Sequence, residues 1–264
     1  MTSAWITALR AIILREFLRF LGQRGRFVSA LVRPLVWLLV FAAGFRAALG
    51  LSIIPPYQTY ITYETYIVPG LCGMICLFNG MQSSLSLVYD REMGSMRLLL
   101  TAPLPRWWLL TAKLVAGSLI SVLQCLAFLA IAAAFGISMN ISGYLFAIPA
   151  IFAAALMLGA LGLLLSSQIR QLENFAGVMN FVIFPMFFLS SALYPLWKMQ
   201  EASLLLYRIC AANPFSHAVE LIRFALYGQM NWLALAVTLG ALVVFGAGAV
   251  WGYDPGRGQT ARKA

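Results

Sequence analysis

Residues 114–169 form an unbroken run of 56 residues without a charged side chain. A helix needs about 20 apolar residues to cross the hydrocarbon core of a bilayer, which is about 30 Å thick. This run is long enough for two crossings, and Gly136, Asn140, Ser142 and Gly143 near its middle favour a turn. The run therefore predicts a hairpin of two membrane-spanning helices.

Three further uncharged runs, residues 65–89, 174–197 and 224–253, each hold one crossing. A sixth segment begins at Val28 and is apolar apart from two arginines whose long side chains can reach an interface. Only 10% of all residues are charged, against about a quarter in soluble domains. We therefore expect an all-α integral membrane protein with one transmembrane domain over residues 1–264. Its six expected spans are residues 28–50, 65–88, 107–135, 144–166, 173–194 and 230–252.

The basic residues are divided unevenly between the two sides that these spans create. Thirteen of the 18 lysines and arginines fall on the side of the two termini, whereas Lys198, Arg208 and Arg223 fall on the other. Because cytoplasmic loops are enriched in Lys and Arg, both termini are expected in the cytoplasm. The net charge of +10 then reflects topology and attraction to the lipid bilayer, and nucleic acid is not an expected partner.

The amino-terminal residues 1–27 have the pattern of an amphipathic helix. Apolar side chains recur there at three- and four-residue spacing, and arginines occupy another face. This pattern predicts an interfacial helix that lies on the inner leaflet, with a contact for a partner protein as the alternative.

The chain lacks the residues of the common catalytic and nucleotide-binding sites. A phosphate-binding loop needs glycine before lysine, and the three lysines follow Ala, Trp and Arg. The single histidine, His217, lies on the expected outer side, and the four cysteines lack zinc-ligand spacing. We therefore expect no enzyme activity, no catalytic residue, no metal site and no cofactor bound by this chain.

Three motifs interrupt the apolar background. Residues 90–105 (DREMGSMRLLLTAPLP) mix charges of both signs with apolar residues and end at two prolines, which predicts a short amphipathic helix along the membrane. Residues 188–196 (FLSSALYPL) end the fifth span, and residues 213–223 (NPFSHAVELIR) follow a stretch too short and too charged to cross. Residues 195–223 are therefore expected to form a re-entrant hairpin in the outer leaflet.

In their order and spacing these motifs resemble those of the type-2 ATP-binding cassette (ABC) export permeases, a family of bacterial polysaccharide, nodulation-factor and drug exporters. The resemblance covers essentially the whole chain. It implies a permease of the bacterial inner membrane that pairs with a second copy of itself and docks on a separately encoded ABC ATPase dimer. ATP and magnesium would bind to that ATPase. The two copies would form a path for an amphipathic cargo, such as a glycan, a lipid-linked molecule or a drug.

The resemblance also implies roles for particular residues. Residues 90–103 correspond to a coupling helix, and the alternative is a solvated connector. The coupling residues are Asp90, Arg91, Glu92, Gly94, Arg97, Leu98 and Leu99. The outer gate comprises Ser190, Ser191, Tyr194, Pro195, Asn213, Pro214, Glu220 and Arg223. Contacts between the two copies are expected at Leu35, Leu38, Phe41, Phe175, Val178 and Phe181.

Two interpretations remain open for the charged and aromatic residues at the outer end. Glu220 and Arg223 are three residues apart on an expected helix and can pair, either to hold the gate or only to neutralise two charges. Arg46 either snorkels to the interface or contacts an anionic cargo. A tyrosine belt at the membrane interface, or alternatively stacking on cargo, is expected from the tyrosines at every third position. These are Tyr57, Tyr60, Tyr63 and Tyr66.

Two other classes of function also fit a multi-pass chain. It could be a non-catalytic membrane subunit of an enzyme complex, whose catalytic groups a second subunit supplies. It could also be a membrane scaffold protein, although a scaffold has no need of the motif at residues 90–105. A neighbouring reading frame with a phosphate-binding loop would favour the exporter.

Overall fold

The computed structural model describes residues 2–22, 24–45, 55–57, 61–92, 105–169 and 171–253. In these residues the regular secondary structure is helical throughout, with ten helices and no strand. The helices are α1 (Thr2–Gly22), α2 (Arg24–Phe45), α3 (Tyr63–Glu92), α5 (Arg106–Ala134), α6 (Ile141–Gln168), α7 (Leu172–Phe188), α8 (Leu196–Ala202), α9 (Leu204–Ala212), α10 (Pro214–Leu226) and α11 (Trp232–Gly252).

Four of these helices contain segments long and apolar enough to cross a membrane. The segments are Tyr63–Tyr89 in α3, Trp107–Ala134 in α5, Ile141–Gln168 in α6 and Trp232–Gly252 in α11. Two shorter apolar segments lie in α2 and α7, at Ala30–Val40 and Leu172–Phe188. Each of the six overlaps one expected span. The all-helical, multi-pass character is confirmed, and the crossing by α2 and α7 stays a prediction.

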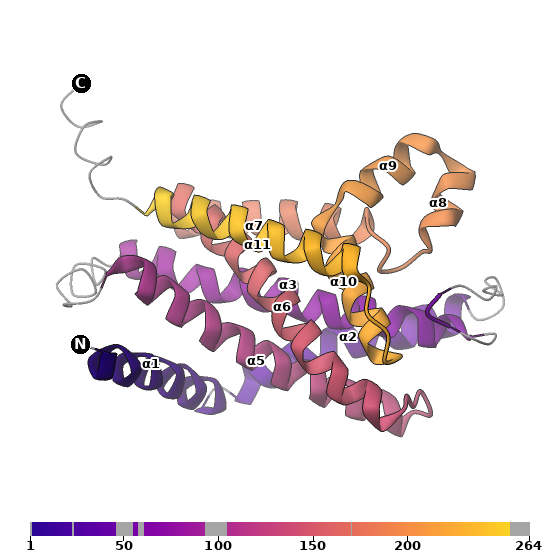
Figure 1. Ribbon diagram of the computed structural model, residues 1–264, viewed down its shortest axis with the longest axis horizontal. Helices are drawn as coiled ribbons and strands as arrows, with labels where there is room; N and C mark the ends of the chain where they lie inside the picture. Colours follow the sequence, from indigo (N-terminus) through magenta and orange to yellow (C-terminus); the bar gives the residue numbers. More distant parts are fainter. Residues whose placement is uncertain are drawn as a thin grey trace.

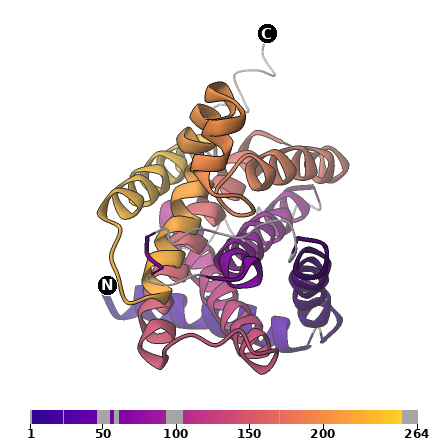
Figure 2. The same cartoon turned by 90° about the vertical axis from the view of Figure 1, so that its right-hand side faces the viewer.

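The long helices form one bundle in which successive helices reverse direction (Figure 1). The start of α1, the end of α3, the start of α5 and the end of α11 all lie toward one end of the bundle, at the left of Figure 1. The hairpin of α8 and α9 projects from the other end. Figure 2 looks along the bundle and shows α1 running across its far end, obliquely to the long helices.

The centre of the bundle is a crossing of α3 and α6 in which the two backbones touch. A Cβ atom on Gly80 would lie 2.9 Å from backbone atoms of Gly159, and a Cβ atom on Gly162 would lie 2.7 Å from the Gly80 carbonyl oxygen. Small residues allow membrane helices to approach this closely. A larger side chain at Gly80 would therefore push α3 and α6 apart.

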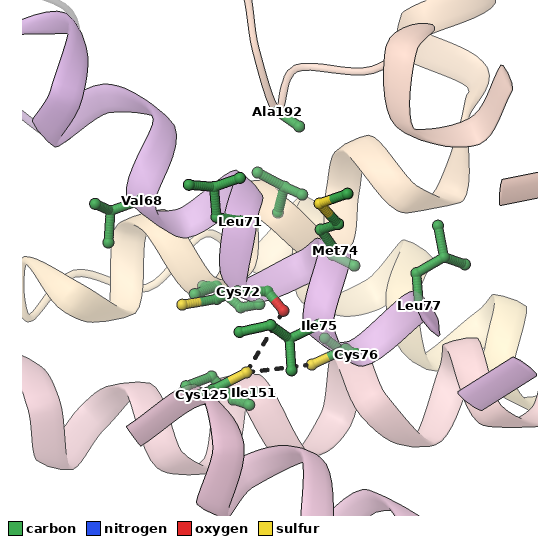
Figure 3. Packing of buried hydrophobic residues seen from close by; sticks show 14 of the residues in the cluster. Val68, Leu71, Cys72, Met74, Ile75, Cys76, Leu77, Cys125, Ile151 and Ala192 are labelled. Atoms are coloured by element: carbon green, nitrogen blue, oxygen red, sulfur yellow. Dashed lines mark hydrogen bonds between the residues drawn. The ribbon is translucent and has the colours of Figure 1, made fainter. Parts of the chain in front are cut away.

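Three buried thiols fill the neighbouring contact between α3 and α5 (Figure 3). The Cys76 and Cys125 sulfur atoms are 3.8 Å apart, and the Cys125 thiol donates a hydrogen bond to the Cys72 carbonyl oxygen at 3.5 Å. Leu71, Ile75 and other apolar side chains surround them. None of the four cysteines forms a disulfide, and all four are small buried packing residues.

Candidate functional site at the outer end

The two outer motifs meet in space through a pair of serines. The Ser191 amide donates to the Ser216 hydroxyl oxygen at 3.2 Å, and the Ser191 hydroxyl donates to the Ser216 carbonyl oxygen at 3.3 Å. The Ser216 hydroxyl in turn donates to the Cys210 carbonyl oxygen at 2.6 Å. These bonds fasten the turn that follows α7 to the first turn of α10.

Asn213 joins the same two helices at their ends. Its side-chain amide donates to the carbonyl oxygens of Met186 and Leu189, at 2.8 and 2.7 Å, while its side-chain oxygen accepts from the Phe215 amide at 3.0 Å. The last carbonyls and first amides of a helix lack partners within the helix. Pro214, which needs no such partner, occupies the first position of α10. One side chain therefore closes the end of α7 and the start of α10.

Arg223 lies at the centre of this region and is only 2% exposed. Its guanidinium forms the ion pair with Glu220 that the spacing of the two residues predicts. It also donates to the Ser191 carbonyl oxygen at 2.9 Å and lies 4.1 Å from the centroid of the Tyr66 ring. A second N–H is directed at the Tyr66 carbonyl oxygen at 3.5 Å. Arg223 thus connects α10 to both α3 and the turn after α7.

The amino-terminal residues of α3 also bind the turn that follows α7. The Tyr66 hydroxyl donates to the Ser191 carbonyl oxygen at 2.9 Å, and the Tyr63 hydroxyl donates to the Leu193 carbonyl oxygen at 3.0 Å. A Cβ atom on Gly70 would lie 2.5 Å from the Ala192 carbonyl oxygen, so only glycine allows this approach. We call the joined residues the outer lock, after the side of the membrane on which they are expected. They are Tyr63, Tyr66, Ser191, Asn213, Ser216, Glu220 and Arg223.

The outer lock contains the ion pair of Arg223 and Glu220, and the tyrosines Tyr57 and Tyr227 lie beside it. Burial by itself lowers the pKa of Arg223, but Glu220 and then the nearby tyrosines raise it above its ordinary value. Burial raises the pKa of Tyr227 to about 12, and it also raises the pKa of Tyr57. Arg223 therefore stays charged while these two hydroxyls stay neutral. Removing one partner of such a buried pair is strongly destabilising, because the other charge is then left buried without compensation.

Comparison with known proteins places this architecture in a family. The sequence pattern of the ABC-2 type transporter family matches residues 7–227. The chain belongs to the ABC-2 type transporter family. It is therefore the membrane subunit of an ABC transporter, a transport component that is not itself catalytic, and permeases of this family work with ABC ATPase partners.

Individual relatives of this ABC-2 permease are named as transport permeases. The chain is 28% identical to transport permease ycf38 of Porphyra purpurea over 231 residues, which cover 86% of this chain and 76% of that protein. It is 29% identical to the ycf38 permease of Pyropia yezoensis over 236 residues, with the same coverage of both chains. It is also 29% identical to the multidrug ABC transporter permease YbhR of Escherichia coli over 170 residues, 63% of this chain and 45% of YbhR.

The remaining outer residues of the permease lie close to the lock. The Ser190 hydroxyl donates to the Phe187 carbonyl oxygen at 2.6 Å and accepts from the Ala192 amide at 3.2 Å, which shapes the turn. Tyr194 is half-buried, and Pro195 precedes the first residue of α8. The eight residues expected at the outer gate thus come together at one end of the permease.

The burial of the tyrosines contradicts the expected tyrosine belt at the membrane interface. Tyr57, Tyr63 and Tyr66 are buried inside the protein, whereas a belt would expose their rings to lipid headgroups. Helix period predicts that Tyr63 and Tyr66 share a face of α3, and the turn after α7 covers that face. Tyr57 precedes the helix and packs against Tyr66 and Tyr227, with 6.4 and 4.8 Å between ring centroids. The same burial keeps a cargo from their rings in this conformation. Tyr60 and Arg46 lie outside the described residues.

The expected coupling segment begins where the description of α3 ends. Asp90, Arg91 and Glu92 form the last turn of α3, and Gly94, Arg97, Leu98 and Leu99 lie outside the described residues. The ends of α3 and α5 that flank this segment lie at the opposite end of the bundle from the outer lock (Figure 1). The role of residues 90–105 stays a prediction.

Sequence reasoning missed three contributors to the lock. Ser216 was part of a motif but had no role, and Tyr63 and Tyr66 were assigned to lipid or cargo. The glycine at position 70 offered a signal, because a glycine inside a membrane helix often marks close approach of another backbone.

Proposed function

We propose that this permease forms, with a second copy of itself and a separate ABC ATPase dimer, an ATP-driven exporter of an amphipathic cargo. The observation that carries the proposal is the position of the outer lock at one end of α3, opposite the end of α3 at Glu92, after which the expected coupling residues follow in the sequence. A single helix thereby links the expected ATPase contact to the expected exit. The transport names of the relatives support the same function.

The proposed topology has six spans, formed by α2, α3, α5, α6, α7 and α11, in a bacterial inner membrane. The bundle end that carries the start of α1 and the end of α11 faces the cytoplasm, because thirteen of 18 basic residues belong to that side. The oblique course of α1 across this end supports its role as an interfacial helix. The α8–α9 hairpin and α10 then occupy the outer leaflet.

The proposed contact between two copies uses the exposed faces of α2 and α7. Phe181 on α7 is 79% exposed, and Phe184 and Phe188 lie on the same face. Trp37 of α2 packs beside Phe187 with 5.8 Å between ring centroids, so α2 and α7 are neighbours. Two of the residues expected here from sequence, Leu38 and Phe175, are instead buried within the chain. We therefore place the contact between copies at Phe181, Phe184 and Phe188 of α7, with Val32, Val36 and Leu39 of α2.

In this proposal the outer lock closes the exit. Closure requires that the turn after α7, the start of α10 and the first turns of α3 hold together, and the bonds to Ser191 unite all three. Opening requires Tyr66 and Arg223 to release one carbonyl oxygen. ATP binding to the ATPase, which would dock at the other end of α3, would supply the energy for that step.

The proposal is tested by isolating the permease with its ATPase. A tagged permease is purified from membranes that also contain the ABC ATPase encoded beside it, and ATP hydrolysis is measured in lipid. We expect a complex of two permeases and two ATPases, with cross-linking between copies of a Phe184→Cys variant. Val250→Cys, exposed on α11, is the control that should not cross-link. Recovery of a monomeric permease without an ATPase would overturn the proposal in favour of a scaffold or an enzyme subunit.

A further inference from the structure

A polar cavity lies where α1 meets α3 and α5. Four polar residues of α3, Asn79, Gln82, Ser83 and Ser86, share one helix face because they are three and four residues apart. Together with Glu16 of α1 and Lys113 of α5 they line a cavity of about 70 Å³. One water molecule needs only about 10–15 Å³ by the same measure, so the cavity has room for a larger polar group.

A second, smaller hollow continues this cavity toward α2. It has a volume of about 20 Å³, shares Asn79 and Gln82 with the first, and is also lined by Arg33. The Arg33 guanidinium lies 3.8 Å from the centroid of the Phe78 ring, which holds it beside the two amides. The amides of α3 therefore lie between a cation from α2 and a cation from α5.

The depth of the cavity matches the inner boundary of a membrane. Lys113 is seven residues from the start of α5, or about 10 Å at 1.5 Å per residue. Trp107 and Trp108, nearer that start, pack against Trp5 of α1 with ring centroids 5.8 and 5.3 Å apart. Clustered tryptophans are typical of the headgroup level. The cavity thus lies just inside the layer of headgroups, on the side assigned to the cytoplasm.

Helix packing alone explains only part of this polar face. Asn79 donates to the side chains of Ser121 and Gln124, which joins α3 to α5. Two cations are not needed for that contact, and ionisable groups at this depth are costly unless they serve a function. Lys113 and Gln82 also interact within the protein. An ammonium has three N–H donors and an amide has two, so each can meet a further oxygen atom.

We propose that this cavity binds the phosphate group of an inner-leaflet phospholipid. The cavity and the adjoining hollow together present two cations, Lys113 and Arg33, and one carboxylate, Glu16, so that their net charge complements the single negative charge of a phosphodiester. Arg15 forms an ion pair with Glu16 at 2.9 Å, which reduces repulsion of the phosphate. The amides and hydroxyls of α3 supply further hydrogen-bond donors.

The acyl chains have an apolar surface beside the cavity. Phe20 of α1 and Ile120 of α5 line the cavity beside its polar groups. A lipid in this position would bridge α1 to the bundle. The site is separate from the outer lock, and it does not depend on whether the permease exports its cargo or what that cargo is.

The test measures lipid binding to the purified full chain in detergent, from the rise in the thermal unfolding midpoint with ligand concentration. The three probes are dioctanoyl phosphatidylglycerol, dioctanoylglycerol, which lacks the phosphate, and inorganic phosphate. We expect saturable stabilisation by phosphatidylglycerol, none by dioctanoylglycerol, and at least tenfold weaker binding of inorganic phosphate. Equal effects of the two lipids would overturn the proposal. Equal affinity for inorganic phosphate would assign the cavity to a soluble anion and also overturn it.

Substitutions locate the binding within the molecule. Arg33→Gln and Lys113→Gln should each weaken phosphatidylglycerol binding about tenfold, as expected for the loss of one charge-assisted contact. Lys113→Arg, which keeps the charge, should retain most of the affinity. Lys198→Gln on α8 removes a cation far from the cavity and is the matched control. Arg33 is exposed, so we expect the Arg33→Gln variant to fold. Unchanged binding in this variant would contradict the site even if Lys113→Gln failed to fold.

Discussion

The Arg223 guanidinium and the Tyr66 hydroxyl donate to the same carbonyl oxygen, that of Ser191, each at 2.9 Å. The two side chains also contact each other, with 4.1 Å from the guanidinium carbon to the ring centroid. Residues 157 positions apart in the chain therefore converge on one acceptor. Because a carbonyl oxygen has two lone pairs, both donors are satisfied at once.

Removing the buried cation should unlock this arrangement. Arg223→Gln leaves Glu220 without its partner, and we expect the free energy of unfolding to fall by roughly 3 kcal/mol, as for broken buried ion pairs. Thermal unfolding in detergent measures the change. The double variant Glu220→Gln with Arg223→Gln should recover part of the loss. Arg208→Gln, exposed on α9, is the control, and an equal effect of both arginine variants would contradict the lock.

The crossing of α3 and α6 should not tolerate one extra methyl group. Gly80→Ala places a Cβ atom 2.9 Å from the Gly159 backbone, and we expect a loss of about 1–3 kcal/mol from overpacking. Gly240→Ala on α11 meets nothing within 4 Å and should be neutral or stabilising, because alanine favours helix more than glycine. Unfolding in increasing concentrations of sodium dodecyl sulfate compares the two. Equal stability of both variants would show that the two backbones do not touch.

The topology can be tested without removing the native cysteines. All four are fully buried, so a membrane-impermeant maleimide should leave the unaltered chain unlabelled. Ser203→Cys, exposed between α8 and α9, should be labelled on intact cells. Gln171→Cys, exposed between α6 and α7, should be labelled only after the cells are opened. The reverse pattern would invert the proposed orientation.

Reversing a charge in the expected coupling segment should separate assembly from folding. In Glu92→Arg and Arg97→Glu, like charges would oppose each other across the ATPase contact, at a cost of several kcal/mol. The permease should reach the membrane in normal amount and recover less ATPase on purification. Glu201→Arg, exposed on α8 at the other end, should recover a normal amount. Normal ATPase recovery by both loop variants would identify residues 90–105 as an ordinary connector.

The sequence predicts the parts of this molecule that depend on local pattern. Uncharged runs place the long helices to within a few residues, because the bilayer sets their length. Three-residue spacing predicts the pair of Glu220 and Arg223, because a helix brings such residues to one face. The meeting of the two outer motifs followed only from the family resemblance.

Other features depend on which segment packs against a helix face, and the local sequence pattern does not predict that segment. The spacing of Tyr63 and Tyr66 is the same for a lipid-facing belt as for hydrogen bonds to a buried turn. Phe175 and Phe181 are six residues apart, which places them about 120° from each other around α7, and one is buried while the other is exposed. Gly80 needs its partner Gly159 to acquire a role, and the two are 79 residues apart in the chain.

The continuity of α3 has a mechanical consequence. Its 30 residues, Tyr63–Glu92, make a rod about 45 Å long with Tyr66 near one tip and Glu92 at the other. A shift of α3 along its axis by two residues' rise, about 3 Å away from the Ser191 carbonyl, would stretch the 2.9 Å bond from Tyr66 to Ser191 beyond hydrogen-bonding distance. A movement of α3 along its axis that is far shorter than the membrane is thick would thus suffice to break the hydrogen bond at the outer side of the membrane.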